Sequence, residues 1–215
     1  DPFSYPVSSF NQIAKTDLAG HDKLSWDEAL RAVERQDPHI VFLASADTTD
    51  EMQIMLRLAE TGRFVLTSLH ANDATSAYWV CFQREVYSYA LASVLAGVVH
   101  CRLAKKLCNS CKTEVQPDQT ALVKVGITSS DIKGKTFYYA PGCADCDNLG
   151  TSGRVGVYEV LELHDHLKGM IETKEASSSF RQAAIDSGMM TLKAAALRKA
   201  AAGIISLEEV IDLVS

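Results

Sequence analysis

Residues 37–73 have the sequence DPHIVFLASADTTDEMQIMLRLAETGRFVLTSLHAND, and its hydrophobic pattern decides the fold class. The pattern predicts a strand at His39–Ser45, a helix at about Asp50–Thr61 that Gly62 ends, and a second strand at Phe64–Leu69. Both strands are nearly continuous apolar runs, which is typical of parallel strands buried on both faces. We therefore expect a strand–helix–strand unit in a parallel sheet, and so an α/β fold.

Three polar residues stand at the carboxyl ends of these strands. Ser45 ends the first strand, Asp47 follows it, and His70 follows the second strand. The carboxyl ends of parallel strands meet at one edge of a sheet, where ligands bind, so we expect any chemistry there. A single histidine is more often a hydrogen-bonded structural residue than a functional one, and these residues alone leave the role of His70 open.

The overall composition is typical of a globular protein, with 47% of the 215 residues hydrophobic and 22% charged. A formal net charge of −6 argues against a dedicated nucleic-acid-binding protein. No apolar run is long enough to span a membrane, and the N-terminus lacks a signal-peptide pattern, so we expect a cytoplasmic location. The chain starts at Asp1 without an initiator methionine, so we expect a fragment of a longer protein.

A helix is predicted upstream of the strand–helix–strand unit. Ser25 and Glu28 have the spacing of a capping box, and Pro38 should end the helix that they begin. Arg31 and Arg35 lie four residues apart and therefore share one face of this helix. From the residues alone, two solvated arginines are the favoured interpretation.

The rest of the chain alternates between helical and strand-like patterns. A short strand is predicted at 11–14. Beyond residue 73 the predicted elements are helices at about Ala74–Arg84 and Tyr87–Leu107, strands at Lys135–Ala140 and Arg154–Leu163, and helices at Ser177–Asp186 and Thr191–Ala202. A last helix should begin at Ser206, where Glu209 completes a second capping box.

Four of the six cysteines form two C-x-x-C pairs. Zinc prefers four soft ligands in a tetrahedron, and this spacing lets both thiolates of a pair bind one ion. We favour a structural zinc site over a redox pair or four buried cysteines, and we assign it no catalysis because four thiolates leave no open position. The proposed ligands are Cys108, Cys111, Cys143 and Cys146, whereas Cys81 and Cys101 lie in apolar surroundings and are expected in the core.

Gly134-Lys135-Thr136 resembles the end of a phosphate-binding loop of the form G-x-x-x-x-G-K-[ST]. The first glycine of that motif would fall at position 129, which is serine, and the segment leads into a predicted strand where the motif requires a helix. We therefore reject it, and no other stretch of the chain has this motif.

Five stretches carry motifs in a fixed order. They are RQDPHIVFL (35–43), TGRFVLTSLHANDA (61–74), an R-L-x-x-x-L-C-x-x-C segment (102–111), a G-C-x-x-C-x-x-x-G-x-x-G-R-x-G-V-Y-E-V segment (142–160) and a closing segment at 188–210 that ends in S-L-E-E-V. Together they resemble the ATPases of type II secretion and type IV pilus assembly, the GspE/PilB type. The likeness covers essentially the whole chain.

The resemblance implies a RecA-like, P-loop NTPase-type motor domain that works as a hexameric ring. Such rings hydrolyse ATP to drive pilin or pseudopilin assembly through a platform protein of the inner membrane, where they are peripheral cytoplasmic proteins. The expected organisation is a motor core at 1–107 that lacks the Walker A segment, a tetracysteine zinc subdomain at 108–163 and a helical region at 164–215.

The resemblance also implies roles for individual residues. Asp1 matches the end of the family's aspartate box, and the Walker A loop is expected upstream of this chain. Arg31 and Arg35 match arginines near the nucleotide, and His70 matches the histidine-box residue that senses it. ATP and Mg²⁺ are the expected ligands if the nucleotide site is functional.

The match fails at one position that matters for catalysis. Ser45 stands where the family has the acidic residue that organises Mg²⁺ and polarises the attacking water. A serine is neither a general base at neutral pH nor a strong Mg²⁺ ligand. The next acid, Asp47, is two residues further on, which is roughly 6–7 Å along a strand, so we expect it to replace the missing acid only in part, through a water molecule. The favoured hypothesis is a subunit of a homo- or hetero-hexameric motor with weakened or lost hydrolysis. The alternatives are an active ATPase whose Walker A loop lies in a missing N-terminal part, and a zinc-ribbon interaction module; no nucleic-acid partner is expected.

Overall fold

The structure is a computed structural model that describes residues 26–116, 122 and 126–214. Asp1, Ser25 and the strand expected at 11–14 lie outside these residues. The described residues form two compact units. The first contains the residues up to Asn72, Ser76–Ala96 and His164–Ala176, and the second contains Asp73–Thr75, Gly97–Leu163 and the residues from Ser177 onward. The division expected at residues 108 and 164 stays a prediction.

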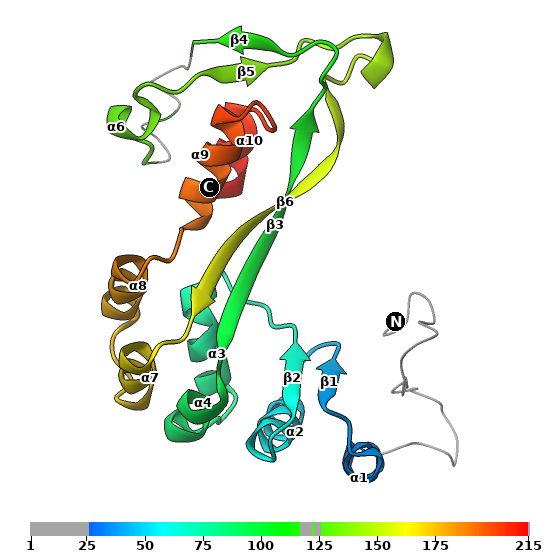
Figure 1. Cartoon of the computed structure of the whole chain (residues 1–215), viewed down its shortest axis with the longest axis vertical. Helices are drawn as coiled ribbons and strands as arrows, with labels where there is room; N and C mark the ends of the chain where they lie inside the picture. Colours follow the sequence, from blue (N-terminus) through cyan, green and yellow to red (C-terminus); the bar gives the residue numbers. More distant parts are fainter. Residues whose placement is uncertain (1–25, 117–121, 123–125, 215) are drawn as a thin grey trace. The chain divides into compact units, whose positions relative to one another are not determined.

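The predicted strand–helix–strand unit is present in the first unit (Figure 1). Strand β1 (Ile40–Leu43) leads into helix α2 (Thr49–Glu60), which leads into strand β2 (Phe64–Thr67). The two strands pair in parallel, with Ile40 opposite Phe64 and Leu43 opposite Thr67. Both strands end about two residues earlier than predicted, so Ser45 and His70 lie in the loops that follow them.

Helix α2 begins at a capping box that the sequence analysis did not identify. The Thr48 hydroxyl accepts a hydrogen bond from the Glu51 backbone N–H at 3.3 Å. The Glu51 carboxylate in turn accepts from the backbone N–H groups of Asp47 at 2.9 Å and Thr48 at 3.0 Å. The helix start therefore has its exposed donors satisfied, and the Glu51 carboxylate is held in place.

Helices complete the first unit. Helix α1 (Trp26–Gln36) ends before Pro38, as predicted. The segment predicted as helix from Ala74 forms a 3₁₀ turn, η1 (Ala74–Ser76), and helix α3 (Ala77–Gln83). Helix α4 (Ser88–Val94) packs against α2 and α7 (Asp165–Glu172), and the buried side chains of these three helices include Met52, Leu56, Leu91, Leu167 and Ile171.

The prediction of one long helix from Tyr87 to Leu107 is wrong. Helix α4 ends at Val94, and strand β3 (Gly97–Leu107) follows and pairs antiparallel with strand β6 (Thr151–Glu162). The apolar residues of the segment fit helical spacing, but Val98 and Val99 are β-branched and favour a strand. The long pairing partner in β6 decides between the two structures.

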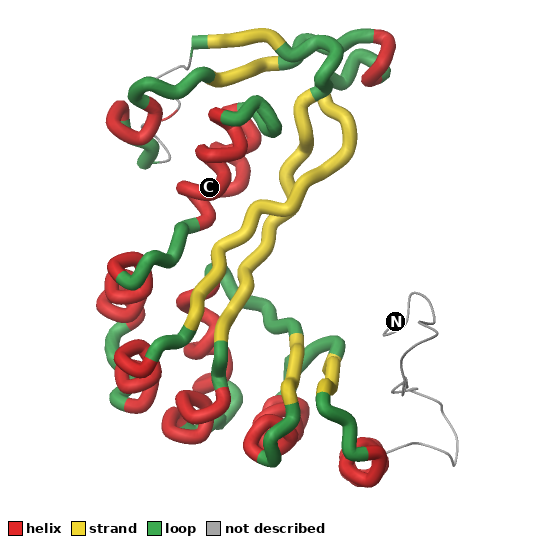
Figure 2. The backbone as a smooth tube through the Cα atoms, viewed as in Figure 1, coloured by secondary structure: helices red, strands yellow, loops and turns green. Residues whose placement is uncertain are grey.

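The second unit is built around the β3–β6 pair, which twists along its length (Figure 2). One face of the pair carries Ala104, Val157 and Leu161, which are buried. Helices α9 (Leu192–Ala201) and α10 (Leu207–Val214) pack against these strands. The core that forms there consists of Ala104, Leu122, Ile127, Phe137, Val157, Ala196, Leu197, Ala200, Ile205, Leu207 and Val210.

The remaining elements of the second unit are short. Strand β4 (Thr113–Val115) pairs antiparallel with β5 (Phe137–Tyr139), and α6 (Ser129–Ile132) precedes β5. The Gly134-Lys135-Thr136 segment therefore leads into a strand, as predicted, whereas a phosphate-binding loop would lead into a helix. A 3₁₀ turn, η2 (Ala144–Cys146), precedes β6, and helix α8 (Ser177–Asp186) has its predicted bounds.

The second predicted capping box is only half formed. The Ser206 hydroxyl accepts from the Glu209 backbone N–H at 3.2 Å, as predicted. In a complete capping box the Glu209 carboxylate would accept from the Ser206 backbone N–H, but here it accepts from the Lys105 backbone N–H at 2.8 Å. This side chain thus ties α10 to β3. Among the described residues no helix is both long and apolar enough to cross a membrane.

Replacing Thr48 with alanine removes the side-chain acceptor at the start of α2. We expect Thr48→Ala to lower the free energy of unfolding by about 1 kcal/mol, the usual effect of losing such a cap. Gln53→Ala, an exposed change inside the same helix, is the control and should stay within about 0.5 kcal/mol of the wild type. Equal effects of the two changes on urea denaturation would contradict the role of Thr48.

Candidate functional site

The loops that follow β1 and β2 lie side by side in the first unit. The Ala46 backbone N–H donates to the Ser68 carbonyl at 3.2 Å, and the Ser68 hydroxyl donates to the Ala44 carbonyl. Ser45 is half-buried between these two contacts, and His70 is exposed two residues beyond Ser68. The structure therefore places both residues in hydrogen-bonded loops at one edge of the sheet, as the parallel topology predicts.

Asp47 lies outside strand β1, and its backbone is fixed by two partners. Its N–H donates to the Glu51 carboxylate at 2.9 Å, and its carbonyl accepts from the Arg84 guanidinium at 2.6 Å. The Asp47 carboxylate is exposed. The expectation that Asp47 is displaced from Ser45 along a strand is wrong, because β1 ends at Leu43 and both residues belong to the loop.

Arg31 and Arg35 are both exposed, one turn apart on helix α1. This matches the face-sharing that their spacing predicts. Asp1, the third residue assigned to nucleotide binding, lies outside the described residues. Their proposed roles therefore stay predictions.

The four cysteines of the C-x-x-C pairs meet in the second unit. Cys108 directly follows β3, and Cys111 lies in the turn before β4. Cys143 precedes the 3₁₀ turn η2, and Cys146 is its last residue. All four sulfur atoms lie within 4.8 Å of one another. The Sγ–Sγ distance is 3.9 Å between Cys108 and Cys143, 4.0 Å between Cys111 and Cys146, and 3.7 Å between Cys143 and Cys146.

These separations fit a tetrahedral metal ion with four sulfur ligands. Zinc–sulfur bonds of about 2.3 Å place neighbouring sulfur atoms at the corners of a tetrahedron with an edge of about 3.8 Å. These three Sγ–Sγ distances, 3.7–4.0 Å, lie close to this edge. In addition, the Cys143 backbone N–H donates to the Cys146 sulfur at 3.2 Å, a contact that stabilises a thiolate. The group could therefore hold one soft metal ion, with all four positions filled by protein.

The thiols of this cluster differ in acidity. Burial raises the pKa of Cys111 to about 12, and burial also raises the pKa of Cys143. Burial acts in the same direction on Cys146, but hydrogen bonds from the backbone N–H groups of Cys143 and Gly150 outweigh it and lower the Cys146 pKa to about 7. A metal ion bound by all four sulfur atoms would require these thiols to release their protons.

The other two cysteines stand apart from the cluster. Cys81 is buried in α3, and burial, only partly opposed by the charge of Arg84, raises its pKa to about 11. Its prediction as a core residue is confirmed. Cys101 is exposed on β3, so its prediction as a core residue is wrong. The error follows from the misassigned helix, because alternation along a strand turns Cys101 to the uncovered face.

The turn that carries Cys143 and Cys146 needs left-handed backbone at three positions. Gly142 has φ +107°, and Asp147 and Asn148 have φ 50° and 59°. An added Cβ at Gly142 would lie 2.5 Å from the Asn148 carbonyl oxygen. The Asn148 N–H donates to the Cys143 carbonyl at 2.9 Å, which closes the turn. Glycine is therefore required at 142 for the two thiols to point at one centre.

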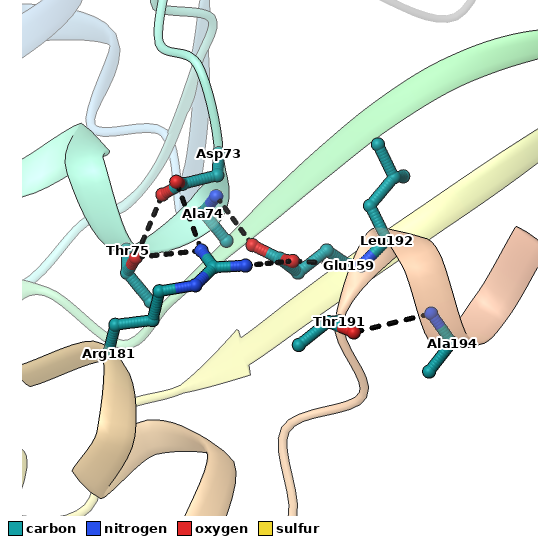
Figure 3. A network of polar contacts seen from close by, with 8 residues as sticks. All are labelled: Asp73, Ala74, Thr75, Glu159, Arg181, Thr191, Leu192 and Ala194. Atoms are coloured by element: carbon teal, nitrogen blue, oxygen red, sulfur yellow. Dashed lines mark hydrogen bonds and ion pairs between the residues drawn. The ribbon is translucent and has the colours of Figure 1, made fainter. Parts of the chain in front are cut away.

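The sequence analysis missed one buried polar group of the second unit. Glu159 on β6 is fully buried and contacts Arg181 and the start of η1 (Figure 3). Its signal was present in the sequence. Val155, Val157, Glu159 and Leu161 alternate on one face of a strand, and a carboxylate among apolar neighbours needs buried partners.

Comparisons with known proteins find one family along the chain. Residues 1–212 match the family described as "Type II/IV secretion system protein". The chain is 33% identical over 211 residues to the type IV pilus assembly ATPase PilB of Thermus thermophilus. The aligned region covers 98% of this chain and 23% of that protein. It is 28% identical over 211 residues to type II secretion system protein E of Pseudomonas aeruginosa. Here the aligned region covers 98% of this chain and 41% of that protein. The chain therefore spans less than half of the length of these relatives.

A solved structure with a similar fold is that of the pilus retraction motor PilT with bound ADP. The TM-score is 0.59 and the sequence identity is 22%, over 90% of this chain and 45% of that one. At this identity the likeness concerns the fold. It agrees with the mixed α/β architecture expected from residues 37–73.

Gly142 offers a test of the cysteine-bearing turn. We expect Gly142→Ala to lower the free energy of unfolding by about 2 kcal/mol or more, because it adds a clash with Asn148 to the strain of positive φ. Gly153→Ala is the matched control, since Gly153 has φ +75° with nothing within 4 Å of an added Cβ, and it should cost about 1 kcal/mol. Thermal denaturation of both variants decides the matter: equal losses would show that the contact at 142 is unimportant.

Proposed function

Because the chain belongs to the type II/IV secretion system protein family, we propose that it is part of a hexameric motor that powers type II secretion or type IV pilus assembly, with weakened or lost ATP hydrolysis. The observation that carries this proposal is the shared edge of the parallel pair. By the family resemblance, Ser45 corresponds to the catalytic acid, and the loop after β1 that contains it is hydrogen-bonded to the loop that leads to His70.

A RecA-like sheet is the form we propose for the complete motor domain. The described β1–β2 pair leaves Ile40, Phe42, Phe64 and Leu66 on one face with exposures of 47–69%. Parallel sheets are almost always covered on both faces, so apolar side chains at this exposure favour a larger sheet with further covering layers. The residues that cover them would come from other parts of the motor.

The lost acid is not easily replaced by its neighbours. Hydrogen bonds fix the Asp47 backbone, through its N–H to Glu51 and through its carbonyl to Arg84. These bonds keep the Asp47 carboxylate away from the position of the Ser45 side chain. The Glu51 carboxylate already accepts two backbone N–H groups at the start of α2. Because a positioned general base or metal ligand contributes orders of magnitude in rate, a serine at position 45 supports slow or absent hydrolysis.

Nucleotide binding would use the remaining family positions. In this proposal His70 senses the nucleotide at the edge of the sheet, and Arg31, Arg35 and Asp1 contribute to binding ATP and Mg²⁺. The exposure of Arg31, Arg35 and His70 supports it, because none of these side chains is enclosed in the first unit. Motor subunits of the same family and an inner-membrane platform protein are the proposed partners, which implies a cytoplasmic protein at the inner membrane.

We assign the four-thiol cluster to structural zinc. The Sγ separations fit four thiolates around one ion, and such a closed site has no position for substrate. The ion would hold together two segments, 108–111 and 143–146, that are far apart in the sequence. The division into a motor core at 1–107, a zinc subdomain at 108–163 and a helical region at 164–215 accompanies this assignment.

Restoring an acid at position 45 tests the catalytic proposal. In the protein encoded by the complete gene, we expect Ser45→Glu to raise steady-state ATP hydrolysis by at least about tenfold, because it supplies the missing metal and water contacts. Ser45→Gln has a similar size without the charge and should leave the rate unchanged. A wild type that already turns over as fast as Ser45→Glu would contradict the loss of hydrolysis.

Metal analysis tests the zinc assignment. We expect about one zinc ion per chain in the wild type and a loss of most of it in Cys108→Ser, with a lower melting temperature, because a structural zinc ion supplies folding free energy directly. Cys101→Ser changes an exposed cysteine outside the cluster and should keep both zinc and stability. Equal zinc content in Cys108→Ser and Cys101→Ser after chelation would refute the site.

A further inference from the structure

A buried carboxylate links two helix starts in the second unit. Glu159 is 0% exposed, and its two oxygens serve different partners. Oε1 accepts from the Ala74 backbone N–H at 3.0 Å, and Oε2 accepts from the Leu192 backbone N–H at 2.9 Å. Ala74 begins the 3₁₀ turn η1 and Leu192 begins α9, and backbone N–H groups at such starts lack partners within their own helix.

An arginine completes this arrangement (Figure 3). Arg181 of α8 lies 3.6 Å from the Glu159 carboxylate and 3.0 Å from the Asp73 carboxylate, through different guanidinium nitrogens. The same side chain contacts the Thr75 hydroxyl at 3.3 Å, and this hydroxyl donates to Asp73 at 2.8 Å. We call Asp73, Glu159 and Arg181 the ionic clamp. It holds residues 73–75 to α8, α9 and β6.

The clamp depends on both oxygens of one carboxylate. A buried charge is costly unless it is paired and hydrogen-bonded, and Glu159 meets this condition only while Ala74, Leu192 and Arg181 all stay in place. A glutamine at this position would have one acceptor oxygen and could serve only one of the two N–H groups. The two helix starts are therefore joined by a group that no neutral side chain of the same size can replace.

The ionic clamp lies next to the segment that is expected to respond to nucleotide in the proposed motor. Asp73 follows His70 by three residues, at the end of the segment that matches the family's histidine box. We propose that the ionic clamp couples this segment to the first turn of α9, and that Glu159 is the positioning residue through which a change after His70 reaches the C-terminal helices. The coupling deepens the proposed function, because it assumes that His70 responds to nucleotide.

Hydrogen exchange of single backbone amides tests the coupling without nucleotide. The ionic clamp links Asp73 to α9 through Arg181 and Glu159. In the protein encoded by the complete gene, we expect Asp73→Asn to accelerate exchange of the Leu192 amide at least about threefold, a size typical of residues that share one network. Asp186→Asn removes the charge of an exposed carboxylate on the same helix α8, where it accepts from Gln182, and it should leave exchange of the Leu192 amide unchanged.

The double variant separates coupling from ordinary destabilisation. In a Glu159→Gln background the Asp73→Asn change should have no further effect on Leu192, because the connection is already broken. Independent, additive effects would overturn the proposal, and so would wild-type exchange at Leu192 in Asp73→Asn. If Glu159→Gln does not fold, the single Asp73→Asn variant and its Asp186→Asn control still decide the question.

Adding ADP with Mg²⁺ distinguishes this inference from the proposed function. In the wild type we expect nucleotide to change exchange at residues 68–72 and at 192–194, and in Glu159→Gln only at 68–72. A merely structural role for Glu159 would lower stability and leave the response at 192–194 intact, which would overturn the positioning role. No nucleotide response at 68–72 would contradict the proposed function, while the variants without nucleotide would still decide the coupling.

Discussion

The antiparallel ladder between β3 and β6 is the interaction on which the second unit depends. It runs from the pair Gly97–Glu162 at one end to the pair Leu107–Thr151 at the other. Because Cys108 directly follows Leu107, closing the ladder brings the first cysteine segment close to the turn that precedes β6. The Cys108 N–H then donates to the Gly150 carbonyl at 2.9 Å. The long gap between Cys111 and Cys143 would therefore add little entropic cost to metal binding by the four thiols, since the strands have already closed the loop.

The same ladder shows where sequence reasoning succeeded and where it failed. Residues 37–73 were predictable because two apolar runs flank a helix with clear ends, so local pattern and parallel pairing agree. Residues 87–107 were not, because the helix α4 and the first residues of β3 together imitate helical spacing. Only the partner strand, which begins 44 residues after β3 ends, distinguishes the two structures. An alternating burial pattern such as that around Ala104 is visible once the partner is known.

The candidate site was predictable to a similar, uneven degree. Cysteine spacing identified the four thiols, because ligand chemistry imposes short spacing within each pair. The parallel topology located Ser45 and His70 at one edge. The buried partners of Glu159 could not be predicted, because Ala74, Arg181 and Leu192 come from three distant segments that meet only in the folded unit. A charged residue on the buried face of a strand indicates that such partners exist, but it does not identify them.

Hydrogen bonds join the cysteine-bearing segment to the turn between the C-terminal helices α9 and α10. The Leu107 N–H donates to the Ile204 carbonyl at 2.9 Å, and the Lys112 ammonium donates to the Gly203 carbonyl at 3.1 Å. Both acceptors lie in the turn between α9 and α10. Structural zinc contributes about 10–16 kcal/mol in small domains, whereas whole domains are stable by about 5–15 kcal/mol. Stabilisation of that size at the end of the ladder would therefore extend through these two hydrogen bonds to α9 and α10. It follows that α9, whose first N–H is bound by Glu159, is held at its start by the ionic clamp and at its end by the cysteine-bearing segment.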